Sequence, residues 1–543
     1  MSCRTMKYLK VILSIALLLL AGCRMPDNGG KQIFRYNESA GITSLDPAFA
    51  KDQTLTWACS QLYNGLICLD ENLKPQPCIA KSWDITPDGK TYTFILRNDV
   101  FFHKSGLFAN PDSTRAVVAS DFLYSFQRII DPDVASPGRW VFDEVQDFNA
   151  PNDSTFVIRL KQPFGPFLSL LGMVYCSVVP HEVVEYYGAD FRQHPCGTGP
   201  FYMQLWKENV KLVMRRNEHY FERDSLGNPI PYLDAVAVTF IVDKQTSFLE
   251  FVKGNLDFMN SLDAAYKDEL LTRAGQLKAK YADRINMVCT PFLNTEYLGF
   301  CMENSATPLN DRRIRQAINY GFDRKKMMKY LRNGIGVPGT GGFVPCGLPG
   351  FDTVSEYGYS YDRKKALNLL SEAGYPHGKG LPVITLSTTS NYLDLCKYIQ
   401  QQLGLLGMQV KVDVCAPATL REQIAKGMSS WFRGSWIADY PDAENYLSLF
   451  YSPNRCPVGS NYTRFMNVDY DSLYVRAKRA TDESERIQLY RQMDRVIMSE
   501  APVVVLYYDQ VLHFTHKNVR GLRSNAMNAL DLRYVRIENN DTL

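Results

Sequence analysis

The stretch Pro308–Leu331, PLNDRRIRQAINYGFDRKKMMKYL, gives the clearest structural signal in this chain of 543 residues. Its apolar side chains recur at spacings of three and four, as they do on the buried face of an α-helix. Asn310 or Asp311 can cap the start of such a helix. We therefore expect a helix over Asp311–Leu331. The positions on its buried face are Ile314, Ala317, Ile318, Gly321, Met327, Met328 and Leu331.

Helical and strand patterns alternate on both sides of this stretch. Period-two alternation predicts strands, and spacings of three and four predict helices. No repeat of fixed period interrupts the alternation, so the chain belongs to the mixed α/β class. The expected strands are Tyr92–Leu96, Arg97–Phe102, Ala235–Val242, Gln409–Val414 and Pro502–Tyr508, and the expected helices are Ser120–Ile130, Tyr361–Ala373, Tyr392–Leu406 and Asp482–Met498.

Composition excludes several classes of protein. With 45% hydrophobic and 22% charged residues, the chain is not a disordered or low-complexity polypeptide. Its length suggests about three to four packed units. The net charge is +3, and Arg4, Lys7 and Lys10 account for all of it, so the rest of the chain is neutral. A neutral body without a long basic run argues against nucleic acid as a partner.

The N-terminal residues have the pattern of an export signal. Three positive charges precede the apolar run Val11–Leu20, which is long enough for a signal peptide and too short to span a membrane. The sequence Leu20-Ala21-Gly22-Cys23 resembles the lipobox of bacterial lipoproteins, in which the cysteine becomes the acylated first residue. An ordinary signal peptide followed by an incidental cysteine is the alternative.

Cysteine and histidine patterns give little support to a metal site. Eleven cysteines follow Cys23, no two of them with CxxC spacing, and their odd number cannot pair completely. Disulfides and buried free thiols both remain open. His513 and His516 are three residues apart but follow a strand, and the sequence has neither a Gly-x-Ser-x-Gly elbow nor a His-Glu-x-x-His motif. We expect no metal, no cofactor and no catalytic residues.

Short motifs in a fixed order resemble one known family. They resemble the family 5 extracellular solute-binding proteins, the dipeptide-, oligopeptide- and nickel-binding components of ABC importers. The resemblance covers about 500 residues, and the lipobox agrees with it. The motifs are Leu45-Asp46-Pro47, Leu62–Leu66 (LYNGL), Ile79–Trp83 (IAKSW), Asp88–Phe94 (DGKTYTF), Ser120–Phe122, Gly197–Phe201 (GTGPF), Asn294–Phe300 (NTEYLGF) and Pro308–Arg324.

The resemblance implies a three-domain periplasmic binding protein-like fold of the class II or cluster C type. Two lobes would close over a ligand, joined by hinge strands through Tyr297–Phe300 and Val503–Tyr508. The expected division is a signal peptide (1–22), a tether (23–31), lobe I in three parts (32–75, 186–293 and 504–543), an inserted domain II (76–185) and lobe III (294–503).

The segment Trp431–Tyr446, WFRGSWIADYPDAENY, contains the expected ligand site. A zwitterionic peptide needs an acidic partner for its ammonium, a basic partner for its carboxylate and a strand edge for its backbone. By resemblance to the family, Asp439 pairs with the ammonium and Arg433 lies near the C-terminal half of the ligand. Trp436 would line a pocket, and the backbone from Ser435 to Ala438 would bond the peptide. The stretch Asn37–Asp46, with Trp57 and Tyr63, is expected near the cleft without individual roles.

The resemblance therefore implies a monomeric, lipid-anchored receptor outside the cytoplasm, on the periplasmic side or the cell surface. It would capture short peptides and pass them to an ABC permease. Within the same fold, a nickel chelate, haem or an oligosaccharide could replace the peptide. A secreted lipoprotein hydrolase is the alternative from another class, and a structural surface lipoprotein or import chaperone is a third.

Overall fold

The computed structural model describes residues 30–109, 112–261, 266–303, 307–351, 353 and 355–538. Cys23, the expected signal peptide and nearly all of the expected tether lie outside these residues. In the part of the chain that is described, no helix combines the length and the apolar character needed to cross a membrane.

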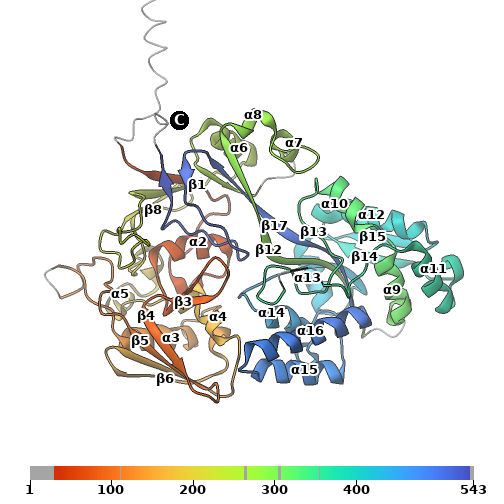
Figure 1. Ribbon diagram of the computed structural model, residues 1–543, viewed down its shortest axis with the longest axis horizontal. Coiled ribbons are helices and arrows are strands. Elements are labelled where there is room, and N and C mark those ends of the chain that lie inside the picture. The colour runs from red at the N-terminus through yellow and green to blue at the C-terminus, as the bar shows by residue number, and fades with distance from the viewer. Residues whose placement is uncertain are drawn as a thin grey trace, which may run out of the picture.

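Two lobes are joined by two long antiparallel strands, β12 (Ile285–Phe300) and β17 (Val503–His516) (Figure 1). The strands pair from Ile285↔His516 to Gly299↔Val503, with irregularities between Pro291 and Thr295 and between Glu296 and Tyr297. They are the centre of an 11-stranded sheet ordered β15-β14-β16-β12-β17-β11-β1-β10-β9-β8, with β13 paired to β17 beside this path. One continuous sheet therefore runs through both lobes.

The first lobe is built on the β8–β11 end of this sheet and carries a separate four-stranded sheet, β4-β5-β7-β6. In the long sheet β1 pairs in parallel with β10 and β11. Its strands are β1 (Ile33–Asn37), β2 (Ile67–Leu69), β3 (Pro75–Pro77), β4 (Ala80–Ile85), β5 (Thr91–Leu96), β6 (Val145–Asn152), β7 (Thr155–Leu160), β8 (Phe201–Lys207), β9 (Lys211–Arg216), β10 (Ala235–Thr239), β11 (Phe258–Asn260), β18 (Val519–Arg520) and β19 (Arg536–Ile537). Its helices are α2 (Gln53–Leu62), α3 (Ala119–Ile130), α4 (Phe167–Leu171), α5 (His181–Tyr187), α6 (Lys244–Lys253), α7 (Lys267–Leu270) and α8 (Ala279–Ala282).

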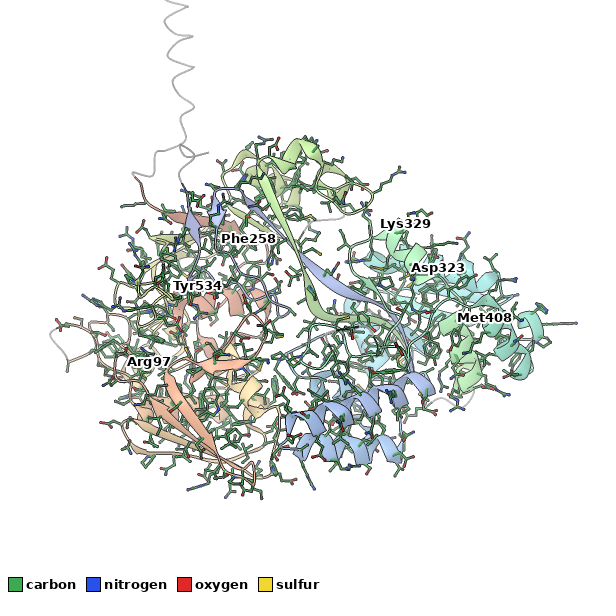
Figure 2. The ribbon with its side chains drawn as sticks, in the orientation of Figure 1. Arg97, Phe258, Asp323, Lys329, Met408 and Tyr534 are labelled. Atoms are coloured by element: carbon green, nitrogen blue, oxygen red, sulfur yellow. The ribbon has the colours of Figure 1, made fainter. Side chains whose placement is uncertain are left out.

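The second lobe surrounds the other end of the sheet. Its strands are β13 (Val337–Pro338), β14 (Ile384–Thr388), β15 (Val410–Val414) and β16 (Trp431–Ile437), and its helices are α9 (Arg312–Tyr320), α10 (Arg324–Leu331), α11 (Arg363–Glu372), α12 (Leu393–Gly404), α13 (Pro417–Ala425), α14 (Glu444–Leu447), α15 (Val468–Arg479) and α16 (Glu483–Glu500). Alternate residues of β12 supply two cores, so Tyr297 belongs to one and Leu298 to the other. Buried Met408 lies in the second lobe and buried Phe258 in the first (Figure 2).

The single helix expected over Asp311–Leu331 is wrong, because the structure has two. Helix α9 ends at Gly321, where a Cβ atom would lie 2.6 Å from a methyl carbon of Leu403. Asp323 then caps α10, since its carboxylate accepts a hydrogen bond from the Lys326 N–H. The apolar pattern continues across this break because both helices pack against the same core.

Two arginines of the same motif tie these helices to the start of β17. The buried Arg315 guanidinium donates to the carbonyls of Leu309, Glu500 and Ala501, among others. The buried Arg324 guanidinium donates to the Val505 carbonyl at 2.6 Å. Burial lowers the pKa of Arg315 to about 10 and that of Arg324 to about 9. Because both pKa values stay above neutral pH, the two guanidinium groups remain protonated and act as multiple hydrogen-bond donors inside the lobe.

The Gly197–Phe201 motif lies where the chain passes very close to α2. A Cβ atom at Gly197 would lie 2.1 Å from the Leu62 carbonyl oxygen, and one at Gly199 would lie 2.4 Å from the Leu62 carbonyl carbon. His103 bridges the motif, with Nε2 3.0 Å from the Gly199 carbonyl and Nδ1 accepting from the Gly197 N–H. Burial lowers the pKa of His103 to about 4. Only glycine fits at these two positions.

The C-terminal segment 517–538 returns to the first lobe and packs against its earliest elements. The Trp57 indole donates to the Asn528 carbonyl at 2.7 Å, and the Gln61 amide donates to the Leu530 carbonyl at 2.8 Å. The N–H of Ile537 donates to the side chain of Gln32. The first lobe is thus assembled from both ends of the chain.

Most of the other expected elements agree with the structure, but the strand expected over Ala235–Val242 ends early, at Thr239, and two further elements differ. Arg97–Phe102 is not a strand, because Arg97 pairs with Asp99 and the stretch makes only an isolated bridge from Phe101 to Ala116. Strand β17 extends to His516, well beyond the expected end at Tyr508. The eleven cysteines among the described residues are free thiols, and six of them are buried.

Candidate functional site

Strand β16 has one open edge. It pairs with β12 along its whole length, but its pairing with β14 is limited to Ser387↔Phe432. The Ala438 N–H donates to the Leu293 carbonyl, and because antiparallel bonds alternate, the backbone groups of Ser435 and Ile437 face away from β12. Among the described strands none pairs with this part of the edge. An extended chain could add to β16 here.

Asp439 lies just beyond the end of this edge and is exposed. Its N–H donates to the side-chain oxygen of Asn445 at 3.2 Å, and the Asn445 amide donates back to its carboxylate at 3.4 Å. Desolvation by the surrounding protein raises the pKa of the carboxyl, and the Asn445 bond opposes that effect. Within the described residues no lysine, arginine or histidine forms an ion pair with Asp439. Its charge is available to a ligand.

Asp439 also faces the first lobe. Tyr175 belongs to that lobe, and burial together with the charges of Asp439 and Asp52 raises the pKa of its phenol to about 12. Two carboxylates, one from each lobe, are therefore close enough to influence the same hydroxyl.

Trp436 and Ala438 lie on the opposite face of β16 from Arg433. The Trp436 indole donates to Asn445 at 2.8 Å and packs against the second-lobe core. Ala438 is buried, and its N–H is already used by Leu293. The Ala438 N–H is therefore not available to a ligand. The free backbone groups are those of Ser435 and Ile437.

The Arg433 guanidinium already has an anionic partner. It forms an ion pair with Glu296, which lies on β12 directly opposite Ser435. It also stacks over Tyr392, with 3.3 Å between the guanidinium carbon and the ring centroid. Glu296 is only 2% exposed, and burial raises the pKa of its carboxyl although Arg433 opposes the shift.

A second ion pair lies beside the first one. Arg332 donates to Asp509 on β17 at 2.8 Å and to the Tyr507 hydroxyl at 3.0 Å. Asp509 also contributes to the electrostatic environment of Glu296. Sequence reasoning missed Glu296, Tyr392, Arg332 and Asp509. A charged residue directly before the apolar residues YLGF of this strand was the one available signal for Glu296.

A cavity of about 400 Å³ lies in the first lobe, at the carboxyl ends of the parallel strands β1 and β11. Asn37, Glu38 and Ser39 line it, and all three belong to the stretch Asn37–Asp46 expected near the cleft. Desolvation raises the pKa of Glu38. Trp57 and Tyr63 are instead buried core residues, each 2% exposed.

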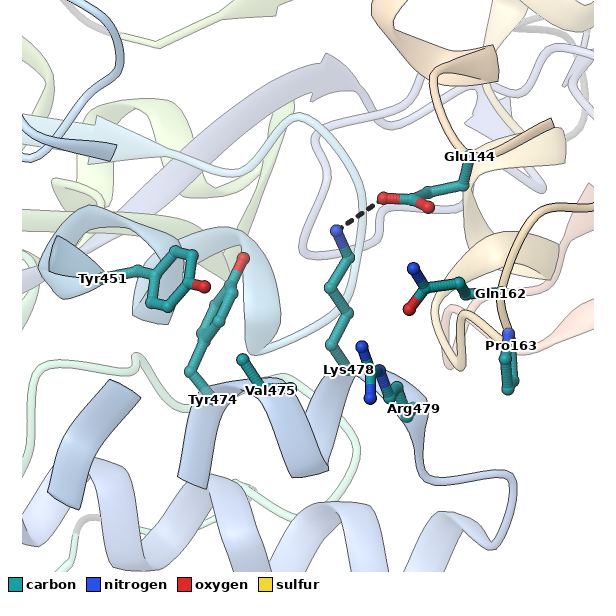
Figure 3. A pocket seen from close by; sticks show the side chains of 8 residues that line it. All are labelled: Glu144, Gln162, Pro163, Tyr451, Tyr474, Val475, Lys478 and Arg479. Atoms are coloured by element: carbon teal, nitrogen blue, oxygen red, sulfur yellow. Dashed lines mark hydrogen bonds and ion pairs between the residues drawn. The ribbon is translucent and has the colours of Figure 1, made fainter. Parts of the chain in front are cut away.

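Far from the hinge strands, the two lobes touch (Figure 3). Lys478 of α15 pairs with Glu144 of the first lobe at 2.6 Å, beside a cavity of about 150 Å³. The Gly165 N–H donates to the Lys478 carbonyl at 3.2 Å. Trp140 of the first lobe lies 6.0 Å from Tyr440, measured between ring centroids. These contacts join the two lobes.

In the described part of the chain, no three or more His, Cys, Asp or Glu side chains are grouped as metal ligands. The two spaced histidines have structural partners. His513 pairs with Asn528 at 2.8 Å, and His516 lies 2.7 Å from the Phe251 carbonyl.

Comparison with known proteins adds independent findings. The family model described as "Bacterial extracellular solute-binding proteins, family 5 Middle" matches residues 74–456. The glutathione-binding protein GsiB of Salmonella choleraesuis (strain SC-B67) is 26% identical over 490 residues, which cover 89% of this chain and 90% of that protein. The ABC transporter-associated periplasmic binding protein DppA from Helicobacter pylori, solved with peptide STSA, is 26% identical with a TM-score of 0.74, over 93% of this chain and 98% of that one. HbpA2 from Haemophilus parasuis, at 22% identity and a TM-score of 0.81 over 93% of this chain and 100% of that one, shares the fold.

Proposed function

Because the chain belongs to the family 5 bacterial extracellular solute-binding proteins, we propose that it captures short peptides between its lobes and delivers them to the permease of an ABC importer. The observation that carries this proposal is the open edge of β16 with an unpaired carboxylate at its end. An extended peptide would bond the backbone of Ser435 and Ile437 and place its ammonium on Asp439. The names of GsiB and of the DppA complex, which mention glutathione and a peptide, support the same ligand class.

Ligand binding would be coupled to closure of the lobes. A ligand that touches both lobes favours the conformation in which they are close, by the difference in its affinity for the two states. β12 and β17 let the lobes move as rigid bodies with few backbone changes. The peptide would join Asp439 on one side to the Asp52 and Tyr175 region on the other.

The location rests on the sequence alone. In this proposal residues 1–22 are removed, Cys23 is acylated, and residues 23–31 form the tether that holds a monomeric receptor at the membrane surface. The division into lobe I, domain II and lobe III at the boundaries given above is part of the same proposal. The protein binds and releases its ligand without chemistry.

Calorimetric titration of Asp439→Asn with a panel of tri- and tetrapeptides tests the proposal. Loss of one charge-assisted hydrogen bond should weaken binding by at least about 1.5 kcal/mol, more than tenfold, with an unchanged melting temperature. Asp84→Asn on exposed β4 is the matched control and should bind as the parent protein does. Equal affinity of the Asp439 and Asp84 variants would remove Asp439 from the site. If native mass spectrometry finds a nickel chelate, haem or an oligosaccharide bound to the protein, that molecule is the ligand in place of a peptide.

A further inference from the structure

The arginine nearest the open edge of β16 carries a built-in counterion. We propose that Glu296 occupies Arg433 in place of a ligand carboxylate, so that the protein accepts peptides whether or not their C-terminus is a free carboxylate. The inference rests on the proposed function and narrows its substrate class to peptides recognised by their amino end and backbone.

The position of Glu296 is fixed by its surroundings. It lies within the paired part of β12, opposite Ser435, and is almost fully buried. The Asn294 amide donates to its carboxylate at 3.1 Å. A carboxylate held in this way does not need to be ordered by a ligand, and it remains beside Arg433 when the site is empty.

Arg433 is held by Glu296 and Tyr392, while its buried Nε has no hydrogen-bond partner among the described residues. Its side chain is 13% exposed, and the Tyr392 ring covers one face of the guanidinium. To reach it, a ligand carboxylate would have to displace Glu296 or share the guanidinium with it. Displacement leaves a buried carboxylate without its cation, and sharing brings two like charges together. Each route therefore carries a free-energy cost that offsets the new ion pair with the ligand carboxylate.

The neighbouring Arg332 does not offer the ligand carboxylate another free cation. Arg332 is paired with Asp509, so the two arginines and two carboxylates of this cluster balance. Asp439 has no such partner among the described residues. The charge that remains for a ligand is therefore negative and lies where a peptide amino end would bind.

Matched peptides of one sequence, as the free acid, the C-terminal amide and the N-acetylated form, test this inference by calorimetry on the parent protein. We expect the acid and the amide to bind within about threefold of each other, and acetylation to weaken binding more than tenfold. A parent protein that binds the acid more than tenfold better than the amide would overturn the inference without touching the proposed function. If no form of any peptide binds, the proposed function fails and the inference fails with it.

Glu296→Gln adds a gain-of-preference test. Glutamine keeps the size of the side chain and releases Arg433, so the acid should now bind at least fivefold better than the amide. Adding Arg433→Met to this variant should abolish that preference. Glu250→Gln, which removes a carboxylate from α6 in the first lobe, is the control and should leave the ratio at its parent value. An unchanged ratio in a folded Glu296→Gln variant would contradict the inference.

Discussion

The contact between Lys478 and Glu144 makes a quantitative prediction about ligand affinity. Glu144→Gln or Lys478→Met removes an ion pair that connects the lobes far from the hinge strands. Both side chains are about one-third exposed, so the pair is worth about 0.2–1 kcal/mol, as partly exposed pairs are. If the pair forms only when the lobes approach, each variant should bind ligand about 1.4- to 5-fold more weakly.

The assay is a double-mutant cycle on ligand affinity, with both single variants and the combined one. The double variant should lose little more than either single variant, because both remove the same interaction. The difference should shrink between 0.1 M and 1 M salt, where the screening length falls from about 10 Å to about 3 Å. Lys253→Met, which breaks an ion pair within α6, is the control and should leave affinity unchanged. Tighter binding by the single variants would mean that the pair favours the open state and would refute the reasoning.

Three further predictions concern stability, measured by urea unfolding. Gly199→Ala should destabilise the fold by about 1–3 kcal/mol, because its Cβ atom would press on α2, whereas Gly106→Ala, with open space around it, should have little effect. Arg324→Met should cost about 1–3 kcal/mol for each carbonyl left unpaired, whereas Lys325→Met on the exposed side of α10 should be neutral. Burial raises the pKa of Asp494 to about 6, so the folded state binds its proton more tightly than the unfolded state does, and the stabilisation present at low pH is lost as pH rises through 6. From pH 5 to pH 7 the parent protein should therefore lose about 1 kcal/mol relative to Asp494→Asn, and parallel pH profiles would contradict this.

The sequence contained enough to predict the class of fold, because the relevant signals are local. Apolar spacing marked the helices, and the order of short motifs marked the family. The break at Gly321 escaped prediction because α9 and α10 share one core and keep one apolar pattern across it. The length of β17 escaped it because Asp509 and Gln510 interrupt the apolar run while the strand continues.

The site was less predictable than the fold. The segment 431–446 was predicted as the ligand segment by resemblance to the family, and in the structure it contains β16 and the turn that carries Asp439. The partner of Arg433 is 137 residues away, and no local pattern announces that pairing. The same holds for Tyr392 and for the pair of Arg332 with Asp509. Whether Asp439, Arg433, Trp436, Ser435 and Ala438 touch ligand stays a prediction.

The return of the C-terminal segment to the first lobe bears on the order in which the two lobes fold. As the chain emerges during synthesis or export, most of the second lobe appears before the stretch that satisfies Trp57 and Gln61, so the second lobe can fold earlier than the first. A nascent chain that ends near residue 520 would expose those donors and the apolar surface around them. The stretch around Asn528 and Leu530 thus completes the first lobe, and a chain truncated before it should be more sensitive to protease.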